Sequence, residues 1–223
     1  MKEMKQENYL NKLNKCENFG EVISAIHDDA RIADVPIIQD DGLDFLLMMV
    51  RLVCPKRILE LGTAVGFSSI MMALNCDATI DTIERNKDMY EKAIGNIKKL
   101  GLEKRINVHF NDALLIDLNE LQDQYDLIFI DAAKAQNKKF FDKYCNLLSD
   151  NGVILTDNIL FHGLVEEYVN MGTLNNCSKD LIAMVRKIHE YNVWLKSLDL
   201  YETTFINVGD GIALTKKRFN YGK

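Results

Sequence analysis

Residues 57–69 read RILELGTAVGFSS and contain the motif that decides the fold. The first five positions form a short, mostly apolar run with the length of a buried strand. Gly62 and Gly66 then bracket a turn, after which an apolar stretch with helical spacing begins. A strand, a tight turn and a helix form the first unit of a parallel α/β sheet, whose ligands bind beyond the carboxyl ends of the strands. The residues that follow each strand are therefore the expected place for a functional site.

Short apolar runs continue to alternate with amphipathic stretches beyond this motif. The pattern predicts strands at 57–61, 78–83, 106–110, 126–131 and 152–156, and helices at 3–16, 20–33, 40–53, 67–74, 87–100, 113–121, 137–148 and 178–191. The tail from 194 to 217, with a Gly-Asp-Gly turn at 209–211, predicts two more strands in an antiparallel hairpin. The expected fold class is α/β, with a doubly wound, mostly parallel, seven-stranded Rossmann-like sheet that ends in this hairpin.

Length and composition limit the class of protein. The chain has 223 residues, of which 48% are hydrophobic and 27% charged, enough for one sizeable core. We expect a single domain over 1–223, with N-terminal helices at 1–53 and the sheet core at 54–216. No apolar run approaches the roughly 20 residues that span a bilayer, and the start MKEMKQENYLNK does not resemble a secretory signal. A cytoplasmic protein without membrane contact is expected. The five cysteines form no C-x-x-C pair, which disfavours a structural zinc site or redox motif.

The charge balance is acidic, with a net charge of −6 and a pI near 5.3. This disfavours a protein that binds nucleic acid through a broad basic surface, but it leaves room for a local basic patch. The candidate residues are Lys134, Lys138, Lys139, Lys143, Lys216, Lys217 and Arg218. A solvated helix face and tail would explain the same residues.

Polar residues after the first three predicted strands indicate a nucleoside cofactor. The 62–68 turn lacks the middle glycine of G-x-G-x-x-G, and the chain has no G-x-x-x-x-G-K-[ST] loop, so dinucleotides and nucleoside triphosphates are disfavoured. Glu84 follows the second strand, where a carboxylate can accept hydrogen bonds from both ribose hydroxyls. Asp112 and Ala113 follow the third strand and could contact an adenine edge. Each feature alone is common, but their order favours an adenosine cofactor without a pyrophosphate.

Oxygen donors follow the fourth and fifth predicted strands. Asp131 ends one, and Asp157 and Asn158 follow the other, so two carboxylates and an amide are expected to converge. Such hard donors suit Mg²⁺, and three of them leave positions for water and for a substrate with two adjacent oxygens. The alternative is that these side chains only bond backbone groups at the strand ends. Asp131 and Lys134 are the candidate catalytic residues: partial burial beside a cation would favour the neutral amine of Lys134 as a general base, although a solvated lysine is an alternative.

The segments ELGTAVGFSS, TIE, NDA, DLIFIDAAK and ILTDN, in this order, resemble the cation-dependent O-methyltransferase family, which includes catechol and caffeoyl-CoA O-methyltransferases. The similarity covers about residues 20–216. It implies a Rossmann-like methyltransferase fold, S-adenosyl-L-methionine as cofactor, and Mg²⁺ held by Asp131, Asp157 and Asn158. The residues expected to line the S-adenosylmethionine pocket are Ile38, Glu60, Gly62, Thr63, Ser68, Glu84, Asp112, Ala113 and Asp131.

Two further segments, DNILFHGLV at 157–165 and INVGDGIAL at 206–214, most resemble a shorter bacterial branch of this family. That branch includes enzymes that convert 5-hydroxyuridine at the tRNA wobble position to 5-methoxyuridine, so the resemblance favours tRNA as partner. A 5-hydroxyl beside a 4-carbonyl could chelate a cation as a catechol does. A small catechol or other vicinal phenol is the alternative acceptor, although the gatekeeping loop of the catechol enzymes is not found. His162 could contact substrate or be a surface histidine, and family members are commonly homodimers.

Two other classes remain possible for a sheet of this kind. One is a nucleoside-binding module without catalysis, which the complete set of oxygen donors disfavours. The other is an NAD-dependent oxidoreductase, which the missing glycine fingerprint disfavours.

Overall fold

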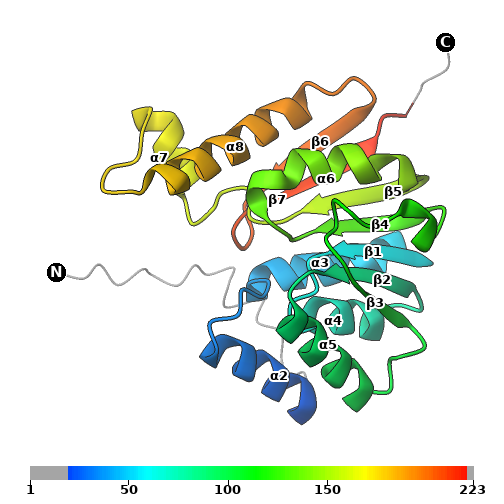
Figure 1. Ribbon diagram of the computed structural model, residues 1–223. Coiled ribbons are helices and arrows are strands. Elements are labelled where there is room, and N and C mark those ends of the chain that lie inside the picture. Colours follow the sequence, from blue (N-terminus) through cyan, green and yellow to red (C-terminus); the bar gives the residue numbers. More distant parts are fainter. Residues whose placement is uncertain (1–19, 220–223) are drawn as a thin grey trace.

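The computed structural model describes residues 20–219 (Figure 1). The helices are α2 (Glu21–Ile32), α3 (Asp40–Val53), α4 (Phe67–Asn75), α5 (Lys87–Lys99), α6 (Asn137–Tyr144), α7 (Leu164–Met171) and α8 (Lys179–Lys196), with short 3₁₀ helices η1 (Leu118–Glu120), η2 (Lys134–Gln136) and η3 (Cys145–Leu147). The strands are β1 (Arg57–Leu61), β2 (Thr79–Glu84), β3 (Ile106–Phe110), β4 (Tyr125–Ile130), β5 (Leu148–Thr156), β6 (Tyr201–Ile206) and β7 (Ile212–Lys217). The predicted helix at 3–16 lies outside the described residues.

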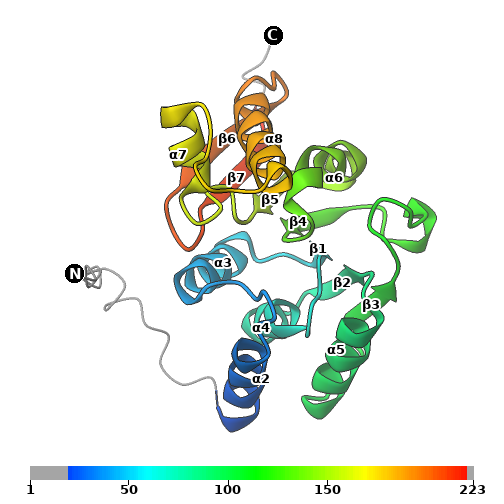
Figure 2. The ribbon, with the colours of Figure 1, turned by 60° about the vertical axis from the view of Figure 1, so that its left-hand side comes forward.

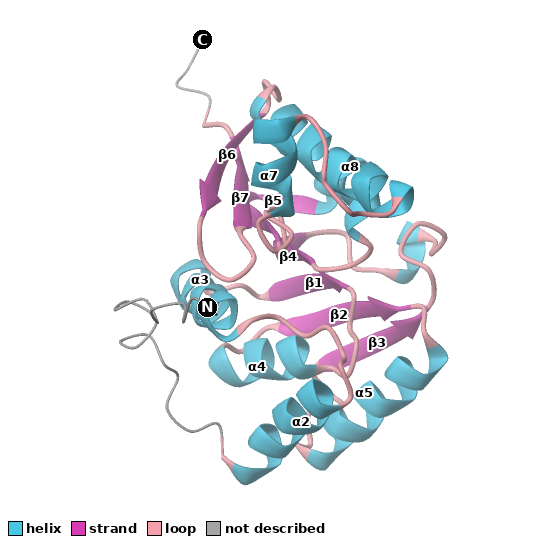
Figure 3. Ribbon diagram, turned by 90° about the vertical axis from the view of Figure 1, so that its left-hand side faces the viewer, coloured by secondary structure: helices cyan, strands magenta, loops and turns pink. Residues whose placement is uncertain are grey.

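One seven-stranded sheet has the order β3-β2-β1-β4-β5-β7-β6, and Figure 3 shows the strands from β3 to β4 in this order from bottom to top. The pairs among β1 to β5 are parallel, whereas β7 is antiparallel to both β5 and β6. This is the predicted fold class, a mostly parallel Rossmann-like sheet with a C-terminal antiparallel hairpin. The chain reverses its strand order between β1 and β4, and ligands of such sheets bind at that point.

Helices cover both faces of the sheet, as Figure 2 shows, with α2 to α5 on one side and α6 and α8 on the other. The alternation of side chains along β1 explains this. Ile58 belongs to the buried cluster under α2 to α5, and its neighbour Leu59 belongs to the cluster under α6 and α8. A smaller cluster, which includes Val165 and Val185, joins α7 to α8. None of the described helices is long and apolar enough to cross a membrane.

The structure corrects several predicted boundaries. The helix expected at 113–121 is a turn followed only by η1, because the Asp112 carboxylate accepts from Leu114 N at 2.8 Å and the Asp117 carboxylate from Asn119 N at 3.0 Å. Aspartates that bond nearby backbone amides in this way compete with a continuous helix. The helix expected at 137–148 ends at Tyr144, and β5 begins at Leu148.

Two further corrections concern the C-terminal third of the chain. Helix α7 was not predicted, although glycines with positive φ flank it at Gly163 and Gly172. Helix α8 continues to Lys196, so the first residues of the predicted tail strands are helical. Ser178, whose hydroxyl accepts from Leu181 N at 3.2 Å, caps the start of α8 as serine commonly does.

Candidate active site

Backbone hydrogen bonds join the strand ends into one row. Gly62 N donates to Ile83 O at 3.0 Å, Asp131 N donates to Leu61 O at 2.9 Å, and Asp157 N donates to Ile130 O at 3.0 Å. The residues that follow β1, β4 and β5 therefore have their backbones fixed by the sheet itself.

A cavity of about 690 Å³ opens above this row of strand ends. Its size is within the range of small-molecule and cofactor sites. Ten of the predicted site residues line it: Ile38, Gly62, Thr63, Ser68, Glu84, Asp112, Ala113, Asp131, Lys134 and Asn158. The other two, Glu60 and Asp157, are not part of the lining and are almost completely buried, at 0% and 2% exposure.

The turn after β1 requires glycine at position 62. Gly62 has a φ of 99°, and a Cβ there would lie 2.3 Å from the carbonyl oxygen of Asp131. No side chain fits at that distance, so the absence of a Cβ allows the β1 and β4 loops to approach each other. Thr63 is held by a 2.6 Å hydrogen bond between its hydroxyl and that of Thr82.

Glu60, a predicted cofactor contact, does not line the cavity in the structure and lies behind its wall. Its carboxylate accepts hydrogen bonds from Ser68 and Thr82, both at 2.5 Å, and from Ser69. Burial raises the pKa of Glu60 to about 7, although these hydroxyl donors oppose that effect. Through these hydrogen bonds Glu60 joins the first turn of α4 to β1 and β2. The sequence pattern E-L-G-x-x-x-G-x-S-S does not distinguish such a structural glutamate from one that contacts the cofactor.

Glu84 lies at the cavity with both carboxylate oxygens already oriented. One oxygen accepts from Ala64 N at 2.9 Å, and the other accepts from Asn86 N at 2.7 Å. A carboxylate fixed at the end of β2 retains lone pairs for further donors, such as a pair of hydroxyls. Asp112 and Ala113 border the same part of the cavity from the loop after β3.

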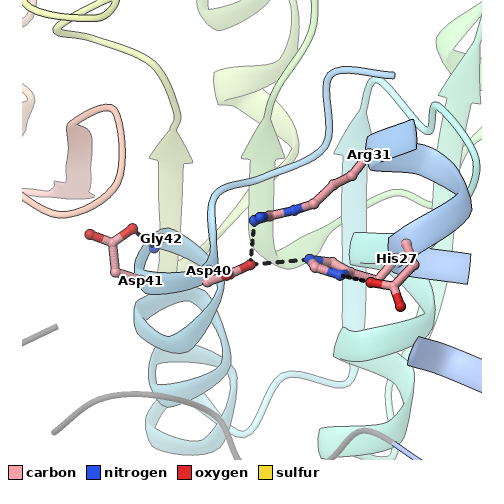
Figure 4. Close-up of polar contacts among 6 residues, drawn as sticks. His27, Arg31, Asp40, Asp41 and Gly42 are labelled. Carbon is pink, nitrogen blue, oxygen red and sulfur yellow. Dashed lines mark hydrogen bonds and ion pairs between the residues drawn. The ribbon is translucent and has the colours of Figure 1, made fainter. Parts of the chain in front are cut away.

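The segment 35–39 between α2 and α3 forms the opposite wall of the cavity. Figure 4 shows how its ends are fixed, with Arg31 and His27 of α2 directed at Asp40, the first residue of α3. The Asp40 carboxylate accepts from the Arg31 guanidinium at 2.7 Å and lies 3.1 Å from His27 Nε2. Ile38, in the middle of the segment, is 3% exposed and lines the cavity as expected for the predicted contact.

The three predicted metal ligands lie together at the ends of β4 and β5. Burial, and next the charge of Asp131, raise the pKa of Asp157 above its ordinary value, and Lys134 opposes this. Lys134 Nζ donates to Asp131, and both side chains are largely buried. No three His, Cys, Asp or Glu side chains among residues 20–219 form a metal-binding group, so the candidate set is two carboxylates and the Asn158 amide. This donor set fits Mg²⁺, because a hard cation would compensate carboxylates that repel each other in a buried setting.

The cavity lining includes residues that were not in the predicted site, among them Asp210 and Phe161. Asp210, in the Gly-Asp-Gly turn, is 5% exposed, and Phe161 belongs to the loop after β5. The turn at 209–211 was interpreted only as a hairpin connection, and no local signal places it beside Asn158. His162 lines the cavity as well, although its side chain is 68% exposed.

A model of the O-methyltransferase family matches residues 16–218 of the chain. Caffeoyl-CoA O-methyltransferase of Populus kitakamiensis is 34% identical over 191 residues, which are 82% of this chain and 77% of the plant protein. The structure of a candidate caffeoyl-CoA O-methyltransferase of Staphylococcus aureus has a TM-score of 0.84 and 37% identity, over 94% of this chain and 98% of that one. TomG, an O-methyltransferase of Streptomyces achromogenes solved in complex with SAM, has a TM-score of 0.76 and 25% identity over 95% of each chain.

The chain therefore belongs to the O-methyltransferase family. These matches confirm the resemblance to the cation-dependent, caffeoyl-CoA type and identify the protein as an S-adenosylmethionine-dependent O-methyltransferase. The interpretations as an NAD-dependent oxidoreductase and as a non-catalytic binding module are thereby excluded.

Proposed function

We propose that this O-methyltransferase depends on Mg²⁺ and methylates a hydroxyl that has a second oxygen beside it. The observation that carries the proposal is the juxtaposition of Asp131, Asp157 and Asn158 at the ends of two adjacent strands. The cavity wall formed by Glu84 and Asp112 lies on the same row of strand ends, which would place a bound cofactor beside the oxygen donors.

Each side chain of the site has a different role in the proposed reaction. When bound, Mg²⁺ would supply positive charge that favours deprotonation of the acceptor hydroxyl. Asp131, Asp157 and Asn158 would hold it, and Glu84 would orient the ribose of the cofactor. Transfer of the methyl group to the acceptor oxygen would break its bond to the cofactor sulfur, and Lys134 Nζ would accept the hydroxyl proton. Lys134 Nζ donates to Asp131 in the structure, so this amine lies beside the proposed ligand set and must be neutral when it accepts the proton.

For the acceptor we favour 5-hydroxyuridine at the wobble position of tRNA, with 5-methoxyuridine as product. The support is the bacterial-branch resemblance of residues 157–165 and 206–214. In the structure these two segments lie against each other, because Ile159 N donates to Gly211 O at 3.1 Å and Leu160 N donates to Asp210 O at 2.9 Å. They form the cavity wall beside the oxygen donors, where an acceptor would be recognised.

A small catechol or other vicinal phenol is the second candidate. Two observations favour it. The relatives include plant enzymes named for caffeoyl-CoA and for flavonoids. Two lysines of the expected basic patch are also engaged within the protein: Lys138 Nζ donates to Asp142 at 2.7 Å and lies 4.1 Å from the Trp194 ring centroid, and Lys143 Nζ donates to Ile116 O.

Methyl transfer from labelled S-adenosylmethionine tests both parts of the proposal. The acceptors are tRNA that carries 5-hydroxyuridine, the same tRNA with unmodified uridine, and a simple catechol, each with Mg²⁺ or with chelator. We expect chelator-sensitive labelling of the hydroxylated tRNA at much lower concentration than catechol. Labelling of catechol alone would assign a small-molecule acceptor, and labelling that chelator does not reduce would contradict the Mg²⁺ requirement.

A further inference from the structure

The turn at 208–211 between β6 and β7 brings a buried carboxylate to the candidate cation site. The Asp210 side chain is 4% exposed, although the turn joins two strands at the edge of the sheet. Such a buried charge is costly unless it accepts several hydrogen bonds. The hydrogen-bond donors to Asp210 therefore indicate its function.

Both carboxylate oxygens of Asp210 accept hydrogen bonds from the loop after β5. Oδ2 accepts from the side-chain amide Nδ2 of Asn158 at 3.1 Å, and Oδ1 accepts from the backbone N of His162 at 2.5 Å. The loop between these contacts has an unusual backbone, with φ values of 59° at Asn158, 48° at Phe161 and 56° at His162. Asparagine and histidine tolerate this left-handed region better than most residues, whereas a bulky residue such as Phe161 adopts it only where its surroundings hold it there. The hydrogen bond from His162 N to Asp210 Oδ1 is one of the contacts that hold this loop.

The contact to Asn158 also determines which way its amide faces. A carboxylate offers only acceptors, so the nitrogen of the amide must point to Asp210, and the amide oxygen must point away from it. Asn158 lines the cavity, and its oxygen is one of the three proposed cation ligands. Without Asp210 the amide could rotate and present its NH₂ group, which cannot bind a cation.

The turn that carries Asp210 is itself fixed on its other side. A Cβ at Gly209 would lie 3.2 Å from Gly42 Cα, which places the turn directly against the start of α3. Figure 4 shows Asp41 and Gly42 at that helix end, with Asp40 directed to Arg31 and His27 of α2. A Cβ at Gly211 would lie 2.5 Å from Leu160 Cγ, so the turn is equally close to the loop after β5. Asp210 is thus held between two walls of the cavity.

We propose that Asp210 is a positioning residue: it fixes the amide of Asn158 so that the amide oxygen faces the bound cation. This inference rests on the proposed Mg²⁺ site and goes beyond it, because Asp210 acts through Asn158 and not as a cation ligand. Partners of this kind commonly change metal affinity about 10- to 100-fold when they are removed.

The first test measures Mn²⁺ affinity from the free-ion electron paramagnetic resonance signal, without turnover. In Asp210→Asn the new side chain has a single oxygen, which cannot replace both carboxylate oxygens that accept from Asn158 Nδ2 and His162 N. We therefore expect Mn²⁺ affinity to fall at least about tenfold. The same substitution in an Asn158→Ala background should change affinity less than about threefold, because the amide it orients is gone. An equal loss in both backgrounds would show that Asp210 acts only by its charge, and would overturn the proposal.

Exchanging the side chains at positions 158 and 210 separates the effect of amide orientation from the effect of net charge. Asn158→Asp adds a carboxylate beside the cation but removes the donor to Asp210, so we expect weaker Mn²⁺ binding. Adding Asp210→Asn to that variant restores a donor–acceptor pair with the original net charge, and affinity should return to within about threefold of wild type. If Asn158→Asp binds Mn²⁺ as tightly as wild type, or if the double variant shows no recovery, the proposal is wrong.

Asp81→Asn is the matched control for loss of a buried carboxylate. Asp81 is 6% exposed, accepts from Tyr125 at 2.8 Å and lies on β2 away from the cation site. We expect it to lower the thermal midpoint and to leave Mn²⁺ affinity unchanged. If Asp210→Asn behaves in the same way, its role is only structural. If the wild-type protein does not bind Mn²⁺, the proposed Mg²⁺ site fails first and this inference fails with it.

Discussion

The cavity has a cofactor end, lined by Glu84 and Asp112, and a cation end, formed by Asp131, Asp157 and Asn158. These two ends are built differently. At the cofactor end, the contacts join residues close in sequence, such as Ser68 to Glu60 eight positions away and Ala64 to Glu84 twenty positions away. At the cation end, Asn158 and His162 depend on Asp210, which is 52 and 48 positions away. The cofactor end is therefore a product of successive βα units, whereas the cation end is completed only when the C-terminal hairpin pairs with β5. The two ends should respond differently to substitution.

The largest effect is expected from Asp157→Ala at the cation end. Loss of this buried ligand should reduce methyl transfer about a thousandfold or more and leave S-adenosylhomocysteine affinity within about threefold. Steady-state kinetics and calorimetric titration measure the two quantities. Asp150→Ala, at a 96% exposed position of the same strand, is the matched control and should change neither. Equal loss of turnover and of cofactor binding would contradict the division between the two ends.

Gly62→Ala should damage both ends, because this residue lies where they meet. Its Cβ would collide with the Asp131 carbonyl in a backbone conformation that L-residues rarely adopt. We expect a loss of about 3 kcal/mol or more in the free energy of unfolding and at least tenfold weaker S-adenosylhomocysteine binding. Gly95→Ala in α5, where a Cβ meets nothing within 4 Å, should be neutral or stabilising. A stable Gly62→Ala protein with normal cofactor affinity would disprove the close approach of the two loops.

The raised pKa of Glu60, which packs behind the cofactor end, predicts that the free energy of unfolding depends on pH. Its pKa in the folded protein is about 7, above the ordinary value of 4.5, so the folded state keeps a proton that the unfolded chain releases between these values. The contribution of Glu60 to the free energy of unfolding is fully present below pH 4.5 and is lost as the pH rises to about 7. This loss is no more than about 3 kcal/mol. Glu60→Gln should reduce this slope in urea unfolding measured across that range, and Asp157, whose pKa is also raised, should account for a remaining slope of the same sign. The same slope in variant and wild type would assign it to other groups.

The smallest effect is expected from Glu84→Gln. One carboxylate oxygen becomes an NH₂ group, so one of the acceptors for backbone or ribose donors is lost while the fold is retained. We expect about tenfold weaker S-adenosylhomocysteine binding and unchanged Mn²⁺ affinity. Glu91→Gln, at an exposed position on α5, serves as the control. A change in Mn²⁺ affinity of similar size would mean that the ends are coupled.

Much of the architecture could be predicted because its signals are local. The apolar runs of β1 to β5 are short and evenly spaced, and Gly62 and Gly66 identify the first turn without ambiguity. The predictions failed where side chains compete with a helix, as Asp112 and Asp117 do in the loop after β3. They failed again at α7, a short helix whose apolar residues pack only on α8.

For the site, the sequence by itself determined which side chains follow each strand, because parallel strands place their carboxyl ends at one edge. That rule was enough to select Glu84, Asp131, Asp157 and Asn158. Only the tertiary structure decided that Glu60 turns into the core and that Asp210 reaches Asn158. The first depends on which face of β1 carries the residue, and the second on a hairpin that pairs over a long sequence separation, and neither leaves a local pattern.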